Sequence, residues 1–315
     1  MQEPDVVVLR QNIHGLAAPD LAATIRDRRP DLDVAVADTP SEERTLLETA
    51  RIAVGLDLEA SALADATNLK LFACVFAGTG HLPLSTFEEH GIAVTNASGV
   101  HGPNIAEYVV GAMIGHARKF HRAYRQQTRR EWRSYQSTEV YGSTVAIVGL
   151  GAIGTTVVDR LEPFDVETIG VRYSPEKGGP TDRVYGFGAF HEAAANAEYV
   201  VLACPLSDAT EGLVDADALR TMRSDAVLVN VARGKVVDTD ALVSALRNNE
   251  IRGAALDVTD PEPLPEDHPL WGLGTVTITP HNAGHTPEYF ERVTDILVEN
   301  TDRLANGDEL RNRVV

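Results

Sequence analysis

The sequence predicts an α/β protein made of two doubly wound parallel-sheet domains, Rossmann-like or flavodoxin-like, with a cleft between them. Short apolar runs alternate with polar stretches of helical spacing, which is the pattern of a parallel sheet covered on both faces. This alternation occurs in two series, and the glycine-rich phrase VAIVGLGAIG at residues 145–154 opens the second series. The 315 residues suffice for two domains that each bury a core.

The first series predicts five strands in the N-terminal third of the chain. Pro19 and Pro40 stand near the expected helix starts between them. The apolar runs that predict these strands are residues 6–10, 33–36, 52–54, 71–76 and 92–95.

A long helical pattern at residues 103–120 leads through the Arg- and Gln-rich stretch 118–133 into the second series. Six further strands are predicted there, at residues 144–149, 166–171, 199–203, 226–230, 253–257 and 275–279. The amphipathic segment 287–305 predicts a last helix that returns to the first domain. The expected domains are therefore 1–101 plus 285–315, and 102–284, with hinges near 99–103 and 283–286.

The charge balance excludes several kinds of partner. Acidic residues outnumber basic ones by 46 to 28, for a net charge of −18, and only four of the basic residues are lysines. Nucleic acids and anionic membranes are therefore poor partners. An acidic surface that avoids lysine predicts a halophilic protein in a salt-rich cytoplasm, because concentrated ions screen self-repulsion. The alternative is an ordinary acidic protein from a GC-rich genome.

Two features predict a cytoplasmic location. No apolar run approaches the about 20 residues of a membrane helix, and the N-terminus lacks a signal-peptide pattern. Cys74 and Cys204 lie in strand-like segments, so we expect buried, reduced thiols.

The glycines at 149, 151 and 154 predict a dinucleotide site, because they follow an apolar strand and open a helical run. The first permits a tight turn, the second lets backbone approach the pyrophosphate, and the third packs helix on strand. Ala152 and Ile153 begin the helix, whose N–H groups and dipole face the phosphates. A glycine turn without a ligand is the alternative.

Arg172 predicts a preference for NADP(H). NAD sites place Asp or Glu at the end of the second strand, where this chain has Arg172 followed by Tyr173 and Ser174. A guanidinium pairs with a 2′-phosphate, the serine hydroxyl adds a donor, and the tyrosine lies against the adenine. The alternative is a solvated arginine and use of NAD(H).

Three further phrases end later strands: VNVARG at 229–234, LDVTDPEP at 256–263, and TPHNAG at 279–284. With GLGAIG, this ordered set resembles the NAD(P)-dependent, D-isomer-specific 2-hydroxyacid dehydrogenase family over essentially the whole chain. The resemblance implies an active site of Arg233, Glu262 and His281. A surface ion pair, a solvated loop glutamate and a plain strand-end histidine are the respective alternatives.

These residue types suit reduction of a 2-keto acid. A protonated histidine hydrogen-bonds the carbonyl oxygen and delivers the proton, and a neighbouring carboxylate orients the ring and favours its protonated form. A guanidinium fork clamps carboxylate and carbonyl beside the nicotinamide.

The resemblance implies further contacts. Asp257 is expected to hold the nicotinamide carboxamide, with helix capping as the alternative, and the substrate carboxylate is expected at the loop Phe76, Ala77, Gly78 and Thr79. The usual aspartates are replaced by Gly80 and Pro83 in that loop, which leaves its selectivity open. The other residues expected along the cofactor are Cys204, Pro205, Thr210, Val231, Ala232 and Gly284.

Three histidines near the presumed cleft, His81, His101 and His285, are interpreted as structural or rim residues. No cluster has metal-ligand spacing, so no catalytic metal is predicted. The helix 103–120 and the following arm resemble the family's dimerisation segment, which implies a homodimer with Trp132 as an interface anchor or a core residue.

We therefore predict a cytosolic, NADPH-preferring reductase of 2-keto acids to D-2-hydroxy acids. A glyoxylate or hydroxypyruvate reductase is the nearest alternative, and formate or phosphonate oxidation on the same scaffold stays open. A dinucleotide-sensing corepressor is the alternative from another class.

Overall fold

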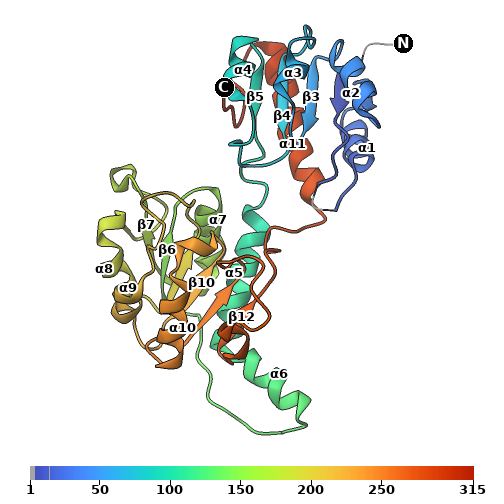
Figure 1. Ribbon diagram of the computed structural model, residues 1–315. Helices are drawn as coiled ribbons and strands as arrows, with labels where there is room; N and C mark the ends of the chain where they lie inside the picture. Colours follow the sequence, from blue (N-terminus) through green and yellow to red (C-terminus); the bar gives the residue numbers. More distant parts are fainter. Residues whose placement is uncertain (1–3, 14) are drawn as a thin grey trace. The chain divides into compact units, whose positions relative to one another are not determined.

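The computed structural model describes residues 4–13 and 15–315, which form two compact units. One comprises the chain up to Val100 together with His285–Val315, and the other comprises His101–Gly284. Each contains one parallel sheet with helices on both faces (Figure 1). The predicted fold class of two parallel α/β sheets is confirmed, whereas the assignment of substrate and dinucleotide to the two units stays a prediction.

The sheet of the first unit has the strand order β2-β1-β3-β4-β5, which is the flavodoxin-like order. Alternate residues of β1 enter different cores: Val6 and Val8 pack on one face, Val7 on the other. The strands are β1 (Val6–Val8), β2 (Val34–Val36), β3 (Ile52–Gly55), β4 (Leu71–Cys74) and β5 (Ala93–Thr95).

Five helices cover this sheet. The first and last pack against one face, where Leu21 and Ile25 meet Val293 and Ile296, and the other three supply Leu47, Leu63 and Phe87 to the opposite face. The helices are α1 (Ala18–Arg28), α2 (Pro40–Leu47), α3 (Ala60–Leu63), α4 (Leu84–Glu89) and α11 (Tyr289–Asn306).

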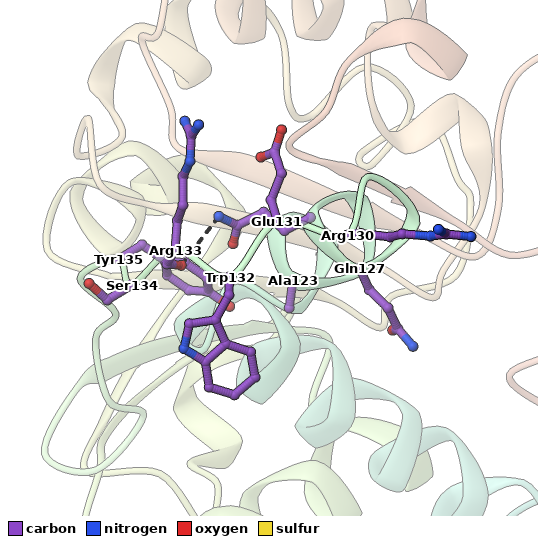
Figure 2. A pocket seen from close by; sticks show the side chains of 9 residues that line it. Ala123, Gln127, Arg130, Glu131, Trp132, Arg133, Ser134 and Tyr135 are labelled. Carbon is purple, nitrogen blue, oxygen red and sulfur yellow. Dashed lines mark hydrogen bonds between the residues drawn. The ribbon is translucent and has the colours of Figure 1, made fainter.

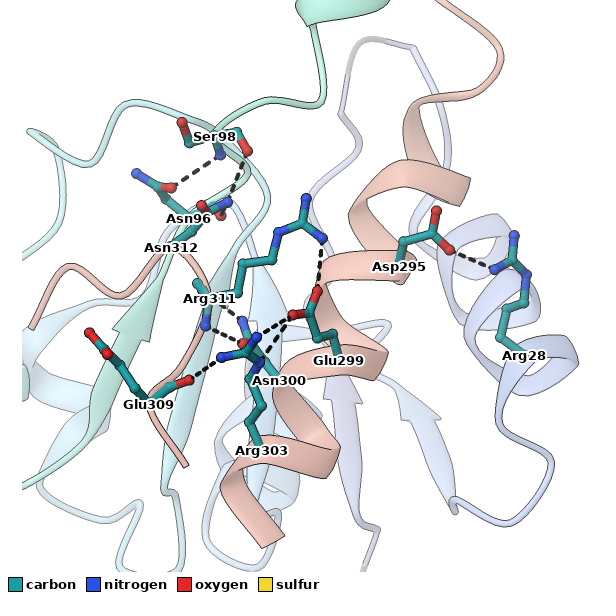
Figure 3. Close-up of polar contacts among 10 residues, drawn as sticks. All are labelled: Arg28, Asn96, Ser98, Asp295, Glu299, Asn300, Arg303, Glu309, Arg311 and Asn312. Atoms are coloured by element: carbon teal, nitrogen blue, oxygen red, sulfur yellow. Dashed lines mark hydrogen bonds and ion pairs between the residues drawn. The ribbon is translucent and has the colours of Figure 1, made fainter. Parts of the chain in front are cut away.

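Polar contacts fix the C-terminal segment to this first unit (Figure 3). Glu299 on α11 accepts hydrogen bonds from Arg303 and Arg311, and Asn300 exchanges two hydrogen bonds with the backbone of Arg311. The Asn312 side chain then donates to backbone carbonyls next to β5. The chain after residue 285 is therefore an integral part of the first unit, as the amphipathic pattern predicts.

The sheet of the second unit has the order β12-β11-β10-β9-β6-β7-β8, which is the Rossmann order extended by one strand. The sequence analysis missed β8, a three-residue edge strand whose partly buried side chains give no apolar run. The strands are β6 (Thr144–Val148), β7 (Glu167–Val171), β8 (Arg183–Tyr185), β9 (Tyr199–Leu202), β10 (Val227–Asn230), β11 (Gly253–Leu256) and β12 (Val276–Ile278).

The predicted helix 103–120 is wrong at its end, because Lys119 has a left-handed backbone (φ 54°) that separates α5 from α6. Val109 of α5 and Val157 of α7 pack on one face of the sheet, while α8, α9 and α10 cover the other face. These helices are α5 (Gly102–Ala117), α6 (Phe120–Thr128), α7 (Ala152–Leu161), α8 (Phe190–Ala195), α9 (Ala216–Thr221) and α10 (Thr239–Arg247).

Two further predictions concern the state of the cysteines and the presence of membrane-spanning helices. Cys74 and Cys204 are buried and unbridged, as expected. Among the residues that the structure describes, no helix is long and apolar enough to cross a membrane.

Candidate active site

Six of the predicted site segments of the second unit follow strands that run parallel in one sheet, so they meet at its carboxyl edge. In an open parallel sheet the ligand crevice forms at this edge, where the strand order reverses. That reversal lies between β6 and β9. The residues that follow the strands are Gly149 after β6, Arg172 after β7, Cys204 after β9, Arg233 after β10, Asp257 after β11 and His281 after β12.

At two positions of the turn after β6, the surrounding protein atoms lie so close that only glycine fits. Gly149 has a positive φ of 98°, and a Cβ there would lie 2.7 Å from the backbone of Cys204. A Cβ on Gly154 would lie 1.9 Å from the carbonyl oxygen of Gly149. The turn therefore closes tightly between strand and helix, as the motif predicts.

Gly151 differs from these two, because a Cβ there would meet no protein atom within 4 Å. It is the N-cap of α7, no side chain caps this end, and Ala152 and Ile153 begin the helix. The first-turn N–H groups therefore have no capping side chain, and the positive end of the helix dipole lies beside the open position at Gly151. An anionic pyrophosphate fits this position, where only glycine leaves the backbone accessible.

Arg172 lies at the start of a short loop after β7. Its Nη1 donates to the carbonyl oxygen of Gly178 at 2.6 Å, and its backbone N–H bonds to Tyr185 on β8. Tyr173 is exposed and Ser174 is partly buried beside it. The guanidinium is thus held by the loop with most of its five donors left over, which suits an anionic ligand.

The segment after β9 is closed by Thr210. Its Oγ1 donates to the Pro205 carbonyl at 2.7 Å and accepts from the Ser207 amide at 2.8 Å. Burial raises the pKa of the Cys204 thiol to about 11, so this residue is inert packing at neutral pH. These contacts give Thr210 a structural role, and the expected cofactor contacts of this segment stay predictions.

Glu262 and His281 form a direct pair. The distance from His281 Nδ1 to Glu262 Oε1 is 2.6 Å, and both side chains are about half exposed. Because a carboxylate accepts and does not donate, Nδ1 carries the proton in this bond, which leaves Nε2 for another partner. The pair lies on the loops after β11 and β12, which are neighbours in the sheet.

The loop of His281 is held by Asp257, which is 3% exposed. The Asp257 carboxylate accepts from the Thr279 hydroxyl at 2.6 Å and from the amides of Asn282 and Ala283, both at 3.0 Å. His281 has a left-handed backbone (φ 52°), and its amide donates to the Asp257 carbonyl at 2.8 Å. Such a conformation persists when neighbours determine it. Asp257 thus stabilises a loop rather than capping a helix.

Arg233 is exposed and has no ion-pair partner among the described residues. The buried Asn230 fixes the turn before it by accepting from the Ala232 amide and donating to the Arg233 carbonyl. A Cβ on Gly234 would lie 1.9 Å from the carbonyl oxygen of Thr259. The guanidinium donates from Nη1 to the Ala232 carbonyl at 2.6 Å and forms no ion pair within the described chain, which argues against the surface ion-pair alternative. Val231 is buried beside it.

A cavity of about 600 Å³ adjoins the Glu262–His281 pair. Its remaining walls are largely apolar: Pro263, Leu264, Trp271 and Ile278 contribute most of them.

In the first unit, the predicted substrate loop follows β4. Ala77 and Gly78 are exposed, and the amides of Ala77, Gly78 and Thr79 donate no hydrogen bond within the described part of the chain. The loop is fixed from behind, because the carbonyls of Phe76 and Ala77 accept from Ala97 and Asn96. Free amides on a fixed loop are suited to an anionic group.

Other predicted residues have structural partners. His81 Nε2 contacts the Leu56 carbonyl and His101 Nδ1 contacts the Gly284 carbonyl, which agrees with structural roles. Trp132 is fully exposed, so the core alternative for it is wrong. The sequence analysis missed Asn104 and Tyr108 on α5, which contact the His281 loop; their spacing from His101 was the available signal.

Residues 110–283 match the family described as D-isomer specific 2-hydroxyacid dehydrogenase, NAD binding domain. The chain belongs to this family. The chain is similar to the glyoxylate reductase of Thermofilum pendens, with 34% identity over 260 residues, 80% of this chain and 76% of that protein. The chain is accordingly an NAD(P)-dependent D-2-hydroxyacid dehydrogenase that acts on 2-keto acids.

Two solved structures of this family share the fold over nearly the full chain. The enzyme from Lactobacillus delbrueckii ssp. bulgaricus in its NAD-complexed form has a TM-score of 0.82 at 25% identity, covering 98% of this chain and 99% of that one. The enzyme from Xanthobacter autotrophicus Py2, in complex with NADPH and MES, has a TM-score of 0.80 at 27% identity, covering 99% and 98%. The family thus accommodates both dinucleotides on this fold.

Proposed function

We propose that this dehydrogenase is an NADPH-preferring reductase that converts 2-keto acids to D-2-hydroxy acids. The observation that carries the proposal is the 2.6 Å contact between His281 and Glu262, at the sheet edge that also bears the glycine turn. A histidine whose Nδ1–H is bound by a carboxylate presents Nε2–H to a substrate carbonyl and supplies the proton.

The chain's own residues divide the remaining work. The reduced nicotinamide supplies the hydride when bound. Arg233 clamps the substrate carboxylate and its neighbouring carbonyl. In the first unit, the free amides of Gly78 and Thr79 stay a predicted anion site of that unit. His281 delivers its proton as negative charge develops on the carbonyl oxygen, and Glu262 stabilises the protonated ring before that step.

The geometry around the glycine turn supports the expected cofactor contacts. The pyrophosphate lies against Gly151 and the first turn of α7. Asp257 has four acceptor positions and uses three within the loop, so one position on Oδ2 is left for the nicotinamide carboxamide. The other cofactor contacts that we propose at this sheet edge are Val231, Ala232 and Gly284.

The test is a spectrophotometric screen of straight, branched and aromatic 2-keto acids with both reduced cofactors. We expect His281→Gln to lower kcat by about 10²-fold or more, the scale of positioned acid–base catalysis, and the matched control His191→Gln on α8 to leave it unchanged. Turnover of His281→Gln within a few-fold of wild type would remove the proton-donor role. Tight NADPH binding without turnover on any substrate would favour a sensor instead.

A glyoxylate or hydroxypyruvate reductase is the second candidate, favoured by the similarity to the glyoxylate reductase of Thermofilum pendens. The same screen separates the two candidates. A kcat/KM for glyoxylate or hydroxypyruvate well above that for any larger 2-keto acid would select this alternative.

Arg172 is the residue that we expect to set the cofactor preference. Its guanidinium is anchored to the Gly178 carbonyl, and in this place a carboxylate would be needed to bind a free ribose hydroxyl. We expect Arg172→Asp to lower kcat/KM for NADPH by about tenfold to 10²-fold, the value of a charge-assisted contact, and to leave NADH use equal or better. Equal use of the two cofactors by the wild type would refute the preference.

We also propose that the chain forms a homodimer through the arm at residues 118–133. Seven of its sixteen residues are Arg or Lys and one is acidic, whereas the whole chain carries −18. The fully exposed Trp132 borders an open pocket of about 810 Å³ in this arm (Figure 2). A basic arm with an exposed aromatic complements an acidic second copy. Light scattering of wild type, Trp132→Glu and the control Tyr141→Ala tests this; a monomeric wild type contradicts it.

A further inference from the structure

Helix α5 contacts the loop of His281 at three points along one helical face. His101, the N-cap residue, contacts the Gly284 carbonyl at 3.0 Å, Asn104 donates to the Ala283 carbonyl at 2.8 Å, and Tyr108 Oη lies 2.9 Å from Thr279 Oγ1. Residues separated by three and four positions share a helix face. The loop is therefore fastened to α5 at both of its ends.

The contact of Tyr108 with Thr279 continues to Asp257. Thr279 Oγ1 lies 2.9 Å from Tyr108 Oη and 2.6 Å from Asp257 Oδ1, and it has one proton to donate. A carboxylate accepts only, so Thr279 donates to Asp257 and accepts from Tyr108. Burial raises the pKa of Tyr108 to about 12, with the Asp257 charge adding to the effect, so the tyrosine keeps its proton at neutral pH.

This chain of hydrogen bonds ends on both sides of His281. Asp257 accepts from Asn282 and Ala283, which directly follow the histidine, and Thr279 lies two residues before it. A buried carboxylate that lost one donor would reorient toward other partners, because an unsatisfied charge at 3% exposure is costly. The histidine would then lose the backbone conformation that points its ring at Glu262.

We propose that Tyr108 and Thr279 are positioning residues, which hold the Asp257 carboxylate and through it the loop that aims His281 at Glu262. The inference rests on the proposed proton-donor role of His281. It goes beyond that role by assigning a function to two residues outside the Arg233–Glu262–His281 set, one of them on a helix that precedes the glycine turn in the chain.

The experiment compares Thr279→Val, which removes the hydroxyl at nearly constant shape, with Thr279→Ser, which keeps it, and with Tyr108→Phe. Thr277→Val is the matched control: it is the same substitution two residues earlier, on β12, at a threonine whose hydroxyl makes no hydrogen bond within the described chain. Two quantities are measured: steady-state reduction kinetics against pH, and hydrogen–deuterium exchange of the Asn282 and Ala283 amides without substrate.

We expect Thr279→Val to lower kcat by about tenfold to 10²-fold, because misplacement of a reacting group by about 1 Å costs this much, with the KM for the keto acid nearly unchanged. The pH profile of kcat/KM should differ from that of the wild type, because the contact between Glu262 and His281 is altered. Exchange at Asn282 and Ala283 should accelerate. Tyr108→Phe should show the same changes to a smaller extent, and Thr279→Ser should restore wild-type behaviour.

The outcomes separate this proposal from the proposed function. If Thr279→Val matches Thr277→Val in kcat, pH profile and exchange, the positioning role is wrong while the reductase stands. Faster exchange without any change in kcat or pH profile also overturns it, because the network would then be merely structural. A wild type without turnover refutes the proposed function, and unaltered exchange in Thr279→Val would then overturn the positioning role independently.

Discussion

The glycine turn after β6 and the histidine loop after β12 lie at the same sheet edge but are built in different ways. The turn is held by close approach within a few residues: Gly154 lies against the Gly149 carbonyl, and Gly149 against the backbone of Cys204. The loop is held by hydrogen bonds from distant segments, including Tyr108, which is 171 residues away from Thr279. One region depends on the absence of side chains, and the other depends on their presence.

This difference determines how each region fails. A side chain added at Gly149 or Gly154 clashes with backbone that cannot move without opening the sheet, so we expect a loss of stability. Removal of a single hydroxyl from the loop leaves the core intact, so we expect a loss of activity. The following predictions test that contrast.

The largest effect is expected at Gly154. Gly154→Val places a Cβ 1.9 Å from the Gly149 carbonyl oxygen, and we expect it to destabilise the protein by at least about 3 kcal/mol, the upper range of overpacking. At Gly151 an added Cβ meets no protein atom within 4 Å, so Gly151→Val should cost only about 1 kcal/mol, the scale of a less favourable N-cap, while the Kd for NADPH rises tenfold or more. Denaturant unfolding and cofactor titration measure the two quantities.

Equal loss of stability in both variants would show that the turn has no accessible face. Normal NADPH affinity of Gly151→Val would show that the pyrophosphate does not bind at this position. Either result would break the contrast, since the turn would then be a structural element without a ligand role.

The contrast also explains how much the sequence could predict. The fold class, all strands except β8 and the buried cysteines follow from apolar runs, because burial in a parallel sheet imposes composition locally. The Gly149–Gly154 turn is equally local, and the ordered phrases around Arg233, Glu262 and His281 identify the family.

The support of His281 could not be predicted in the same way. Thr279 and Tyr108 are ordinary residues in a strand end and a helix, and only the fold brings them to Asp257. The break at Lys119 was missed for a related reason: its left-handed backbone is set by the departure of the arm, and helix propensity continues through it.

A smaller effect is expected from acid, and it concerns the helix that supports the loop. His116 is buried at the end of α5, and burial lowers its pKa from 6.5 to about 4. The unfolded chain therefore binds a proton between about pH 6.5 and pH 4 that the folded chain does not bind. The contribution of the neutral His116 to the free energy of unfolding is fully present above pH 6.5. It falls as the pH decreases through this window, by up to about 3 kcal/mol below pH 4.

Urea unfolding at pH 7 and pH 4.5 measures this loss. His116→Gln should show a smaller difference between the two pH values than wild type, and the exposed His90→Gln should not. His121, whose pKa is also lowered by burial, contributes in the same direction and should leave a residual pH dependence in His116→Gln. An unchanged difference in His116→Gln would exclude its burial as the acid-sensitive feature of α5.

The smallest effect is expected from salt. It should distinguish the cofactor region around Arg172 from the histidine loop held by Asp257 without any substitution. The net charge of −18 with four lysines predicts a halophilic protein, and if that prediction holds, Tm should rise by several degrees from low to molar salt. The proposed contact of Arg172 with a 2′-phosphate would lie in a partly exposed loop and be screened, because the Debye length falls to about 3 Å at 1 M. The KM for NADPH should therefore rise several-fold.

The Asp257 network responds differently, because its carboxylate is 3% exposed and its donors are neutral groups of the protein. Buried contacts are screened much less, so kcat should change by less than about twofold over the same series. A parallel fall of kcat and cofactor affinity would mean that the two regions respond as one. A Tm that stays constant across the series would contradict the halophilic proposal, while leaving the kinetic contrast between Arg172 and Asp257 to be judged on KM and kcat alone.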